Sequence, residues 1–307
     1  MEITLERAGM LTTVQDLGRP GHRAAGVALG GAMDPWAARV ANLLVGNAET
    51  AAVLELTMTG AELIFSEEGL LAITGATFTG APSWRPIKVR AGERVTLGAV
   101  VKGCRGYLAV AGGIAVEPVL GSASTDLRGG FGGQGGRAVR DGEVVRTRPV
   151  RRTVAEHWWL DERILPAYSE SPEVRVIRGA QAEEFGESWL GAEFKVTPRS
   201  NRMGLRLSGA ELIRTSAGEL LSSAVAPGTI QVPPDGQPIV LMADAQTIGG
   251  YPQLAHVIGV DLPLVAQLRP GDAMRFRAIE LGEAHHLMAA RERALGLLRE
   301  GLAGKFG

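Results

Sequence analysis

The sequence has few of the residues that define several large classes of protein. Its one cysteine, Cys104, excludes a disulfide framework and a cysteine-based zinc site within the chain. Aromatic residues make up only 5% of the sequence and the net charge is −1, so base stacking and attraction to acidic surfaces are not expected. The composition therefore predicts neither a nucleic-acid partner nor a membrane partner.

Long apolar segments are missing too. No apolar run approaches the ~20 residues that a membrane helix needs. The first residues, Met-Glu-Ile-Thr-Leu-Glu-Arg, lack the basic start and apolar core of a signal peptide. We expect a cytoplasmic protein.

Glycine, in contrast, is abundant. The chain has 42 glycines, about double the usual share of ~7%. They follow no Gly-X-Y period, which excludes collagen and favours many short strands joined by tight turns. The sequence therefore predicts a mainly β fold.

The order of strand, turn and helix patterns divides the chain into four parts. Asp34-Pro35 opens a helix within the first part, since aspartate suits the N-cap and proline the first helical position. The apolar spacing between Glu280 and Leu302 predicts an amphipathic helix at the end. The expected parts are a β domain with a glycine-rich loop at 1–150, a connector at 151–172, a second β domain at 173–280 and a helix at 281–307.

Two short sequence motifs, here called phrases, occur once in each expected β domain. Thr-Gly-Ala-Glu-Leu-Ile at 59–64 returns as Ser-Gly-Ala-Glu-Leu-Ile at 208–213, and Arg-Ala-Gly-Glu at 90–93 resembles Arg-Pro-Gly-Asp at 269–272. The spacings differ, so the chain is not a solenoid. Duplication of one domain and chance similarity both remain open.

The segment 226–252 is the strongest candidate for a binding site. An apolar run from Ile239 to Ala243 predicts a buried strand, and a glycine turn with polar side chains follows it. An acid at the end of a buried strand, followed by such a turn, is a common way to hold a small polar ligand. The candidate residues are Asp244, Gln246, Thr247, Gly249, Gly250 and Tyr251.

Three further motifs carry polar groups on turns. Gln15, Asp16 and Arg19 surround the first glycine turn, and Asn201 and Arg202 lie on a turn in the second domain. The third is a glycine-rich loop suited to an anion or a nucleotide phosphate, to a flexible lid, or to a plain loop. Its candidate residues are Thr125, Arg128, Gly129, Gly130, Gly132 and Gly133.

Several well-known motifs are absent or lack the structural context that they require. Gly-Phe-Gly-Gly-Gln-Gly at 130–135 matches a dinucleotide fingerprint in letters, but no apolar strand precedes it and no clear helix follows. A Walker A lysine, H-E-x-x-H and G-x-S-x-G are absent, and the adjacent His285 and His286 point to different helix faces, so no metal site is predicted. No biotinylation sequence is present, so biotin would not be attached to this chain.

Five motifs occur in a recognisable order along the chain. They are V-Q-D-L-G-R-P-G, G-A-M-D, R-G-G-F-G-G, S-N-R-M-G, and P-G-T-I-Q-V-P-P-D-G-Q-P with A-D-A-Q-T-I-G-G-Y-P. The set resembles the allophanate hydrolase subunit 2 family, also called the KipA or biotin-dependent carboxyltransferase family, over about residues 1–280. The resemblance implies two cyclophilin-like β-barrel domains with a few peripheral helices.

The resemblance is nearest to the family's 5-oxoprolinase branch. It implies ATP-dependent opening of 5-oxoproline to glutamate, with ATP and Mg²⁺ used by a complex that also contains a KipI-like subunit and a LamB/YcsF-like subunit. Two alternatives stay open. One is carboxyl transfer to a urea-like amide from biotin carried elsewhere, and the other is a KipA-like regulator that antagonises a KipI-like kinase inhibitor.

These reactions imply roles for the candidate residues. Asp244 would act as general base, with Arg202, Gln246 and Tyr251 beside it. Gln246 and Asn201 would pair with the amide, and Arg19, Arg128 or Arg202 would hold an anionic group. The sequence departs from the family pattern in three places: Gly133-Gln134-Gly135 replaces an aromatic residue and a glutamate, Ser223 replaces a glutamate, and Ile248 replaces a threonine.

Overall fold

The protein is described from a computed structural model that covers residues 1–150, 160–161, 164–216 and 218–305. Most of the predicted connector, residues 151–159 and 162–163, lies outside the described residues. The chain forms two compact units. Unit 1 comprises Met1–Arg19, Gly30–Leu165 and Arg293–Gly307, and unit 2 comprises Pro20–Leu29 and Pro166–Glu292.

Unit 1 is built from two antiparallel sheets. The order in the four-stranded sheet is β7-β4-β1-β9, and in the five-stranded sheet β2-β3-β8-β5-β6. The strands are β1 (Glu2–Arg7), β2 (Leu11–Gln15), β3 (Val53–Thr57), β4 (Glu62–Phe65), β5 (Gly69–Phe78), β6 (Pro86–Val89), β7 (Arg94–Thr96), β8 (Val100–Val110) and β9 (Glu143–Arg146).

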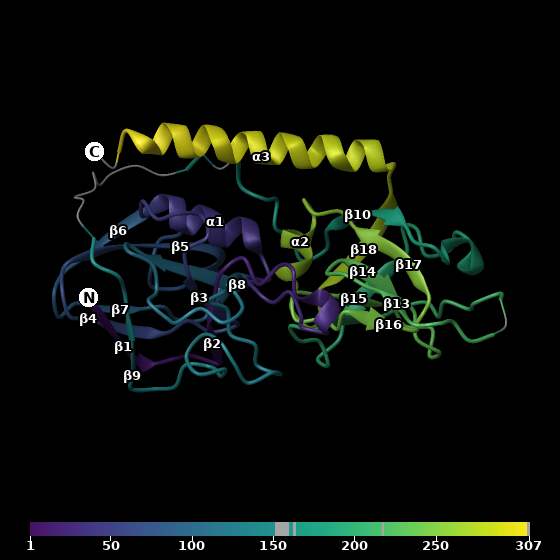
Figure 1. Cartoon of the computed structure of the whole chain (residues 1–307). Coiled ribbons are helices and arrows are strands. Elements are labelled where there is room, and N and C mark those ends of the chain that lie inside the picture. The colour runs from purple at the N-terminus through teal and green to yellow at the C-terminus, as the bar shows by residue number, and fades with distance from the viewer. Residues whose placement is uncertain (151–159, 162–163, 217, 306–307) are drawn as a thin grey trace. The chain divides into compact units, whose positions relative to one another are not determined.

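The core of unit 1 follows from the alternation of side chains along its strands. In β3, Leu54 and Leu56 join the large core cluster with Leu5 and Leu63 of the four-stranded sheet, because successive residues of a strand face opposite sides. Val53 faces the other way and joins the cluster that packs α1 (Pro35–Leu44) onto the five-stranded sheet. Figure 1 shows α1 beside β5.

The predicted start of α1 is confirmed. The Asp34 side chain accepts a hydrogen bond from the Ala37 N–H at 2.9 Å, and Pro35 occupies the first turn. An aspartate N-cap satisfies one of the amides that the first helical turn leaves without a partner.

Unit 2 contains a closed barrel of seven strands in the order β10-β17-β14-β15-β12-β11-β18. Alternate residues of its strands are buried, as in β11, where Phe194 and Val196 are covered and Glu193 and Lys195 are exposed. The Phe276 ring lies between those of Trp189 and Phe194, with centroids at 6.3 and 5.6 Å. Offset aromatic contacts of this kind add to the stabilisation from burial alone.

The remaining elements of unit 2 lie around this barrel. The barrel strands are β10 (Glu173–Arg178), β11 (Glu193–Val196), β12 (Gly204–Ser208), β14 (Thr229–Gln231), β15 (Ile239–Leu241), β17 (Gln253–Val257) and β18 (Ala273–Ala278). A separate two-stranded ribbon pairs β13 (Ser223–Ala224) with β16 (Ile248–Gly249). The helices of unit 2 are η1 (Arg23–Ala25), η3 (Ala182–Phe185) and α2 (Leu262–Ala266). The last helix, α3 (Leu281–Ala303), belongs to unit 2 up to Glu292 and to unit 1 from Arg293, and it confirms the predicted C-terminal helix.

The prediction of a mainly β fold is confirmed, but a closed barrel is seen in unit 2 only. In unit 1 the chain passes from one sheet to the other at short turns, so no continuous ladder joins the described strands into a ring. One such turn lies between β3 and β4, where Met58 has a φ of 66°. A left-handed φ is costly for a residue with a side chain, which makes this turn a strained point of the crossing.

One turn with a fixed hydrogen-bond pattern occurs before three strands. The N–H of Arg90, Arg140 and Arg269 donates to the acidic side chain three residues later at 2.8, 2.9 and 2.8 Å. A glycine with positive φ precedes each acid. The phrases at 90–93 and 269–272 therefore form the same local structure, whereas the phrase at 208–213 does not continue into a strand as 59–64 does.

Candidate functional site

The first polar cluster, in unit 1, is organised by Asp16. Its carboxylate accepts from the Gly18 N–H at 2.8 Å, the Ala123 N–H at 2.6 Å, and the hydroxyls of Ser122 and Ser124 at 2.6 and 2.5 Å. Asp16 is buried, and hydrogen bonds to a buried charged group are among the stronger ones in proteins. Asp16 therefore fastens the end of β2 to the loop at 122–124.

Arg19 lies inside unit 1 and is fully buried. Its guanidinium donates to the Ser124 carbonyl and lies 4.9 Å from the centroid of the Phe131 ring. A Cβ on Gly30 would come within 2.8 Å of Nη1, and one on Gly132 within 3.1 Å of Nη2. Three of the sequence motifs thus meet around this one side chain, and their glycines make room for it.

The glycine-rich loop is closed on its own acid. The Arg128 and Gly129 N–H groups donate to Asp126 Oδ1 at 3.1 and 2.7 Å, and the Gly130 N–H donates to the Asp126 carbonyl at 2.9 Å. The Asp126 carboxylate therefore occupies the position at which a phosphate would meet these amides. Arg128 itself is exposed.

Gly133 and Thr125 explain why this loop needs glycine. A Cβ on Gly133 would lie 1.9 Å from the Thr125 hydroxyl oxygen. Thr125 is fully buried, and its hydroxyl donates to the Val14 carbonyl at 3.0 Å. Gly129, Gly132 and Gly133 of the predicted anion loop therefore serve close packing, whereas a Cβ on Gly130 would meet nothing within 4 Å.

Gln15 is buried at the end of β2. Its Nε2 donates to the Thr13 hydroxyl at 3.0 Å and to the Thr125 carbonyl at 3.3 Å. Its Oε1 has no hydrogen-bond partner among the described residues. Gln15 therefore ties the strand to the loop with its amide nitrogen and leaves one acceptor unmatched.

Sequence reasoning missed a buried acid beside this cluster. Glu55 Oε2 accepts from the Met33 N–H and from the Tyr107 hydroxyl, both at 2.9 Å, and the Asp34 N–H donates to the same hydroxyl at 2.8 Å. Burial first, then the charges of Glu55 and Asp34, raises the pKa of Tyr107 well above its ordinary value. A lone glutamate in the apolar strand Val-Leu-Glu-Leu-Thr was the available signal.

In unit 2, Asp244 and Arg202 form a buried, two-pronged ion pair. Arg202 Nε donates to Asp244 Oδ2 at 2.8 Å, and Arg202 Nη2 donates to Oδ1 at 2.9 Å. The Asp244 N–H also donates to the Arg202 carbonyl at 3.0 Å. The structure thus brings together two residues predicted as catalytic from motifs far apart in the sequence.

Asn201 lies on the turn next to this pair and is exposed. Its side-chain oxygen accepts from the Met203 N–H at 2.8 Å, and its backbone exchanges hydrogen bonds with Gly204. An Asx turn of this kind fixes the chain reversal. The exposed side chain that identifies the S-N-R-M-G motif therefore stands directly outside the buried Arg202.

The glycine turn after Asp244 is shaped by Gln231, another residue that sequence reasoning missed. Gln231 is buried and its Nε2 donates to the Tyr251 carbonyl at 3.1 Å. A Cβ on Gly249 would come within 2.8 Å of that nitrogen. Thr247 is buried with its carbonyl accepting from the Val225 N–H, Gln246 is half-buried, and Gly250 is exposed.

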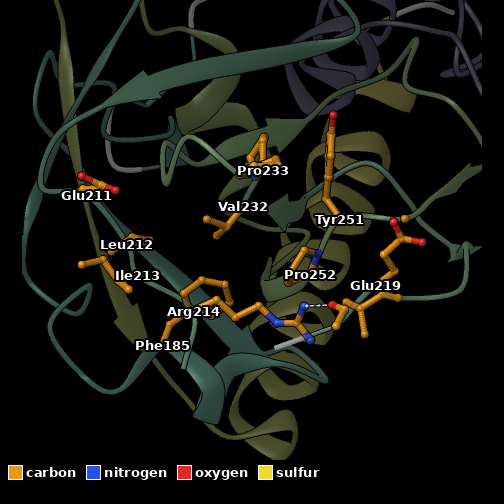
Figure 2. A pocket seen from close by; sticks show the side chains of 14 residues that line it. Phe185, Glu211, Leu212, Ile213, Arg214, Glu219, Val232, Pro233, Tyr251 and Pro252 are labelled. Atoms are coloured by element: carbon orange, nitrogen blue, oxygen red, sulfur yellow. Dashed lines mark hydrogen bonds between the residues drawn. The ribbon is translucent and has the colours of Figure 1, made fainter. Parts of the chain in front are cut away.

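Beyond this turn lies a pocket of about 640 Å³. Its wall is mostly apolar, and Figure 2 shows Tyr251 and Glu219 on one side of it and Glu211 on the other. The lining residues are Phe185, Glu211, Leu212, Ile213, Arg214, Gly218, Glu219, Leu220, Val232, Pro233, Pro234, Gly250, Tyr251 and Pro252. Gly250 and Tyr251 are thus the predicted site residues that border an open pocket.

Arg214, also missed from the sequence, is the cation of this pocket wall. Its Nε donates to Glu184 Oε2 at 2.5 Å and its Nη1 to the Gly218 carbonyl at 2.7 Å. The second of these bonds is the dashed line in Figure 2. Arg214 is therefore held in place by unit 2 itself.

Two features are absent from the described residues. Across the described residues, no group of three or more histidine, cysteine, aspartate or glutamate side chains is arranged to hold a metal ion. Likewise, none of the helices in the described parts of the chain combines the length and apolarity needed to cross a membrane.

The chain belongs to the carboxyltransferase domain family, subdomain A and B, whose model matches residues 25–278. Two bacterial relatives are similar along more than nine tenths of their length. The C subunit of Escherichia coli 5-oxoprolinase is 42% identical over 292 residues, covering 91% of each chain, and that of Haemophilus influenzae is 36% identical over 297 residues, covering 94% of each. The family resemblance predicted from the motifs is confirmed.

A solved structure extends the comparison to the fold. The Kluyveromyces lactis urea amidolyase matches with a TM-score of 0.91 and 30% identity. The match covers 97% of this chain, which spans only 20% of the urea amidolyase chain. This protein is therefore similar to one portion of that much longer protein.

Proposed function

We propose that this chain is the C subunit of an ATP-dependent 5-oxoprolinase, a hydrolase complex that opens the lactam of 5-oxoproline to glutamate. The observation that carries the proposal is the end-to-end match to the C subunit of a 5-oxoprolinase at 42% identity, with 91% of both chains aligned. The buried Arg202–Asp244 pair and the turns around it supply polar groups of the kind that an amide substrate requires.

The complex would contain two further proteins, a KipI-like subunit and a LamB/YcsF-like subunit. ATP with Mg²⁺ would supply the energy that activates the unreactive lactam carbonyl. The loop amides at 128–130 are already bonded to Asp126, so we assign the nucleotide site to one of the other proteins of the complex rather than to this loop.

Within this chain, we assign the amide-facing role to unit 2. Asp244 would act as general base, held in place by Arg202, which donates to both of its oxygens. The Arg202 guanidinium would also stabilise the charge that develops on the amide oxygen. Asp244 and Arg202 would thus act together.

The neighbouring polar residues would orient the substrate. Asn201 and Gln246 each offer a donor and an acceptor to an amide, and Tyr251 offers an exposed ring and hydroxyl. Thr247, Gly249 and Gly250 set the shape of the turn that carries Gln246 and Tyr251. In unit 1, Gln15, Asp16 and Arg19 support this role indirectly, because all three are buried in hydrogen bonds to their own loop.

A coupled assay tests the proposal. The purified chain is mixed with the KipI-like and LamB/YcsF-like subunits, ATP, Mg²⁺ and 5-oxoproline, and glutamate is measured. ATP-dependent glutamate that disappears when this chain is omitted is the expected result. Folded, mixed proteins that release no glutamate would contradict the proposal, and full activity in Asp244→Asn would contradict the role of the base.

A second candidate function rests on the similarity to urea amidolyase. A TM-score of 0.91 over 97% of this chain favours a carboxyltransferase subunit that moves a carboxyl group from carboxybiotin, carried by another protein, to a urea-like amide. The same mixture with urea, bicarbonate and a biotin carrier separates the two functions. A KipA-like regulator would show neither activity and would only bind a KipI-like protein.

We further infer that the chain consists of two cyclophilin-like domains, at 1–150 and 173–280, joined by 151–172 and followed by the helix at 281–307. The separation of the chain into two compact units supports this division. Separate expression of 1–150 and 173–280 tests the boundaries, since each piece should give a cooperative unfolding transition.

A further inference from the structure

The pocket of unit 2 carries uncompensated negative charge at its mouth. Glu211 and Glu219 are exposed, and neither forms an ion pair with another described residue. The cation of the wall, Arg214, is already neutralised by Glu184 at 2.5 Å. A ligand that enters therefore meets two carboxylates without counter-charges.

This charge argues against the reactants of the proposed reaction as occupants of the pocket, so the substrate contact proposed for Tyr251 would lie outside it. 5-oxoproline has a carboxylate, and ATP carries several negative charges. Each would be repelled by Glu211 and Glu219, since like charges at short range disfavour one another even near a protein surface. The pocket is thus suited to a neutral or positively charged group.

Several backbone donors of the wall that could orient a small ligand are missing or already bonded. Pro233, Pro234 and Pro252 contribute no backbone N–H, and the Val232 N–H is bonded to the Pro252 carbonyl. Small-molecule pockets combine an apolar wall with a few convergent donors and acceptors. An apolar side chain of a peptide, held in place by the peptide backbone, fits this wall better than a free small molecule does.

Exposed apolar residues extend beyond the pocket. Leu221 is 94% exposed, Ile213 72% and Ile248 62%. Ile213 lines the pocket, Leu221 follows the lining residue Leu220, and Ile248 lies on the β13–β16 ribbon that leads to Gly250. Single exposed apolar residues are normal, but several around one pocket are typical of a protein-binding surface.

We propose that the pocket and this apolar rim form the docking surface for the KipI-like subunit of the complex. The occupant would be an extended segment of that protein with one large apolar side chain, which enters the pocket, and a lysine or arginine close to it, which pairs with Glu211 and Glu219. The identity of the partner rests on the proposed function, whereas the chemistry of the segment rests on the pocket.

Binding of the purified KipI-like subunit to the full-length chain tests the apolar part of the docking surface. The double variant Leu221→Glu/Ile248→Glu should bind at least tenfold more weakly than the wild type, because both side chains lose their apolar contact and add repulsive charge. Met10→Glu is the matched control: Met10 is 68% exposed in unit 1, and its substitution should change the affinity less than twofold.

Charge reversal tests the acidic part. Glu211→Lys/Glu219→Lys should weaken binding about tenfold and should reduce the dependence of the affinity on salt. Glu117→Lys is the control, since Glu117 is also exposed and lies in unit 1. Circular dichroism and thermal melting should show that all these surface variants remain folded.

A photo-crosslinking amino acid at position 221 identifies the occupant directly. The expected product is a covalent adduct with a peptide of the KipI-like subunit that contains a large apolar residue within a few positions of a lysine or arginine. An adduct with an acidic peptide, or wild-type affinity in both double variants, would overturn the docking surface while the coupled assay still reports on the function. Absence of binding between the wild-type chain and the KipI-like subunit would overturn the proposal outright.

Discussion

The two units use similar motifs in opposite ways. In unit 1, the glycine-rich loop, the Gln15–Arg19 turn and the Gly30–Asp34 turn close around Arg19, which is fully buried and donates to the Ser124 carbonyl. In unit 2, the turn that carries Thr247 to Tyr251 ends at an open pocket, and Tyr251 is 47% exposed.

The difference shows what a polar glycine turn requires in order to bind a ligand. A turn binds when its donors point outwards, and it serves as scaffold when an internal carboxylate has already taken them. Asp126 in unit 1 takes the loop amides, whereas in unit 2 Asp244, the acid after the buried strand, is paired by the side chain of Arg202 from a separate turn. This contrast favours unit 2 as the place of the chemistry.

The largest effect is expected from Arg202→Met. It leaves the Asp244 carboxylate buried without its guanidinium partner, and loss of one member of a buried ion pair costs about 3–5 kcal/mol. Urea unfolding should show a free energy of unfolding lowered by that amount. The double variant Arg202→Met/Asp244→Leu should recover most of the loss, and no recovery would mean that the pair is more than an isolated ionic contact.

Gly133→Ala should have the next largest effect on stability. Its Cβ would clash with the Thr125 hydroxyl at 1.9 Å and its φ is +50°, so overpacking of about 1–3 kcal/mol adds to the cost of a left-handed residue. Gly130→Ala isolates the backbone cost, because its φ is +69° but nothing lies within 4 Å of the added Cβ. Equal melting temperatures for the two variants would refute close packing of this loop.

Tyr251→Ala separates stability from activity. The side chain is 47% exposed, and changes at such positions usually alter the free energy of unfolding by less than about 0.5 kcal/mol. We expect glutamate production by the complex to fall about tenfold while the unfolding curve stays unchanged. A large loss of stability with unchanged activity would reverse the assignment of chemistry to unit 2.

The smallest effect concerns Glu143 in unit 1. Hydrogen bonds from Arg137 and then from the Arg140 N–H lower the pKa of Glu143 from 4.5 to about 2. A lowered pKa in the folded state stabilises the protein above the unfolded value, and this contribution is lost as the pH falls from about 4.5 towards 2. Glu143→Gln should flatten this part of the stability curve, only slightly because Arg137 is 39% exposed.

Local patterns in the sequence predicted local structure well. The Asp34 N-cap and the C-terminal helix depend on contacts between near neighbours, and the apolar run before Asp244 indicates a buried strand by its composition. The prediction of two barrels was only partly confirmed, because closure of a sheet depends on pairing between distant strands, which short motifs do not encode.

The candidate site was predictable to the same degree. Asp244 and Arg202 were both identified by their motifs, but their ion pair joins residues 42 positions apart and reveals itself only in three dimensions. Gln231 and Arg214 carry no signal in the sequence, because their roles come from the Gly249 backbone beside one and the Glu184 carboxylate beside the other.

The coupled assay with the Asp244→Asn variant tests the central claim most directly. The KipI-like and LamB/YcsF-like subunits, ATP and 5-oxoproline should yield glutamate with the wild-type chain and at least a hundredfold less with Asp244→Asn, while Gly130→Ala keeps wild-type activity. Equal glutamate production with the wild-type and the Asp244→Asn chains would contradict the account, because the chemistry would then not depend on unit 2.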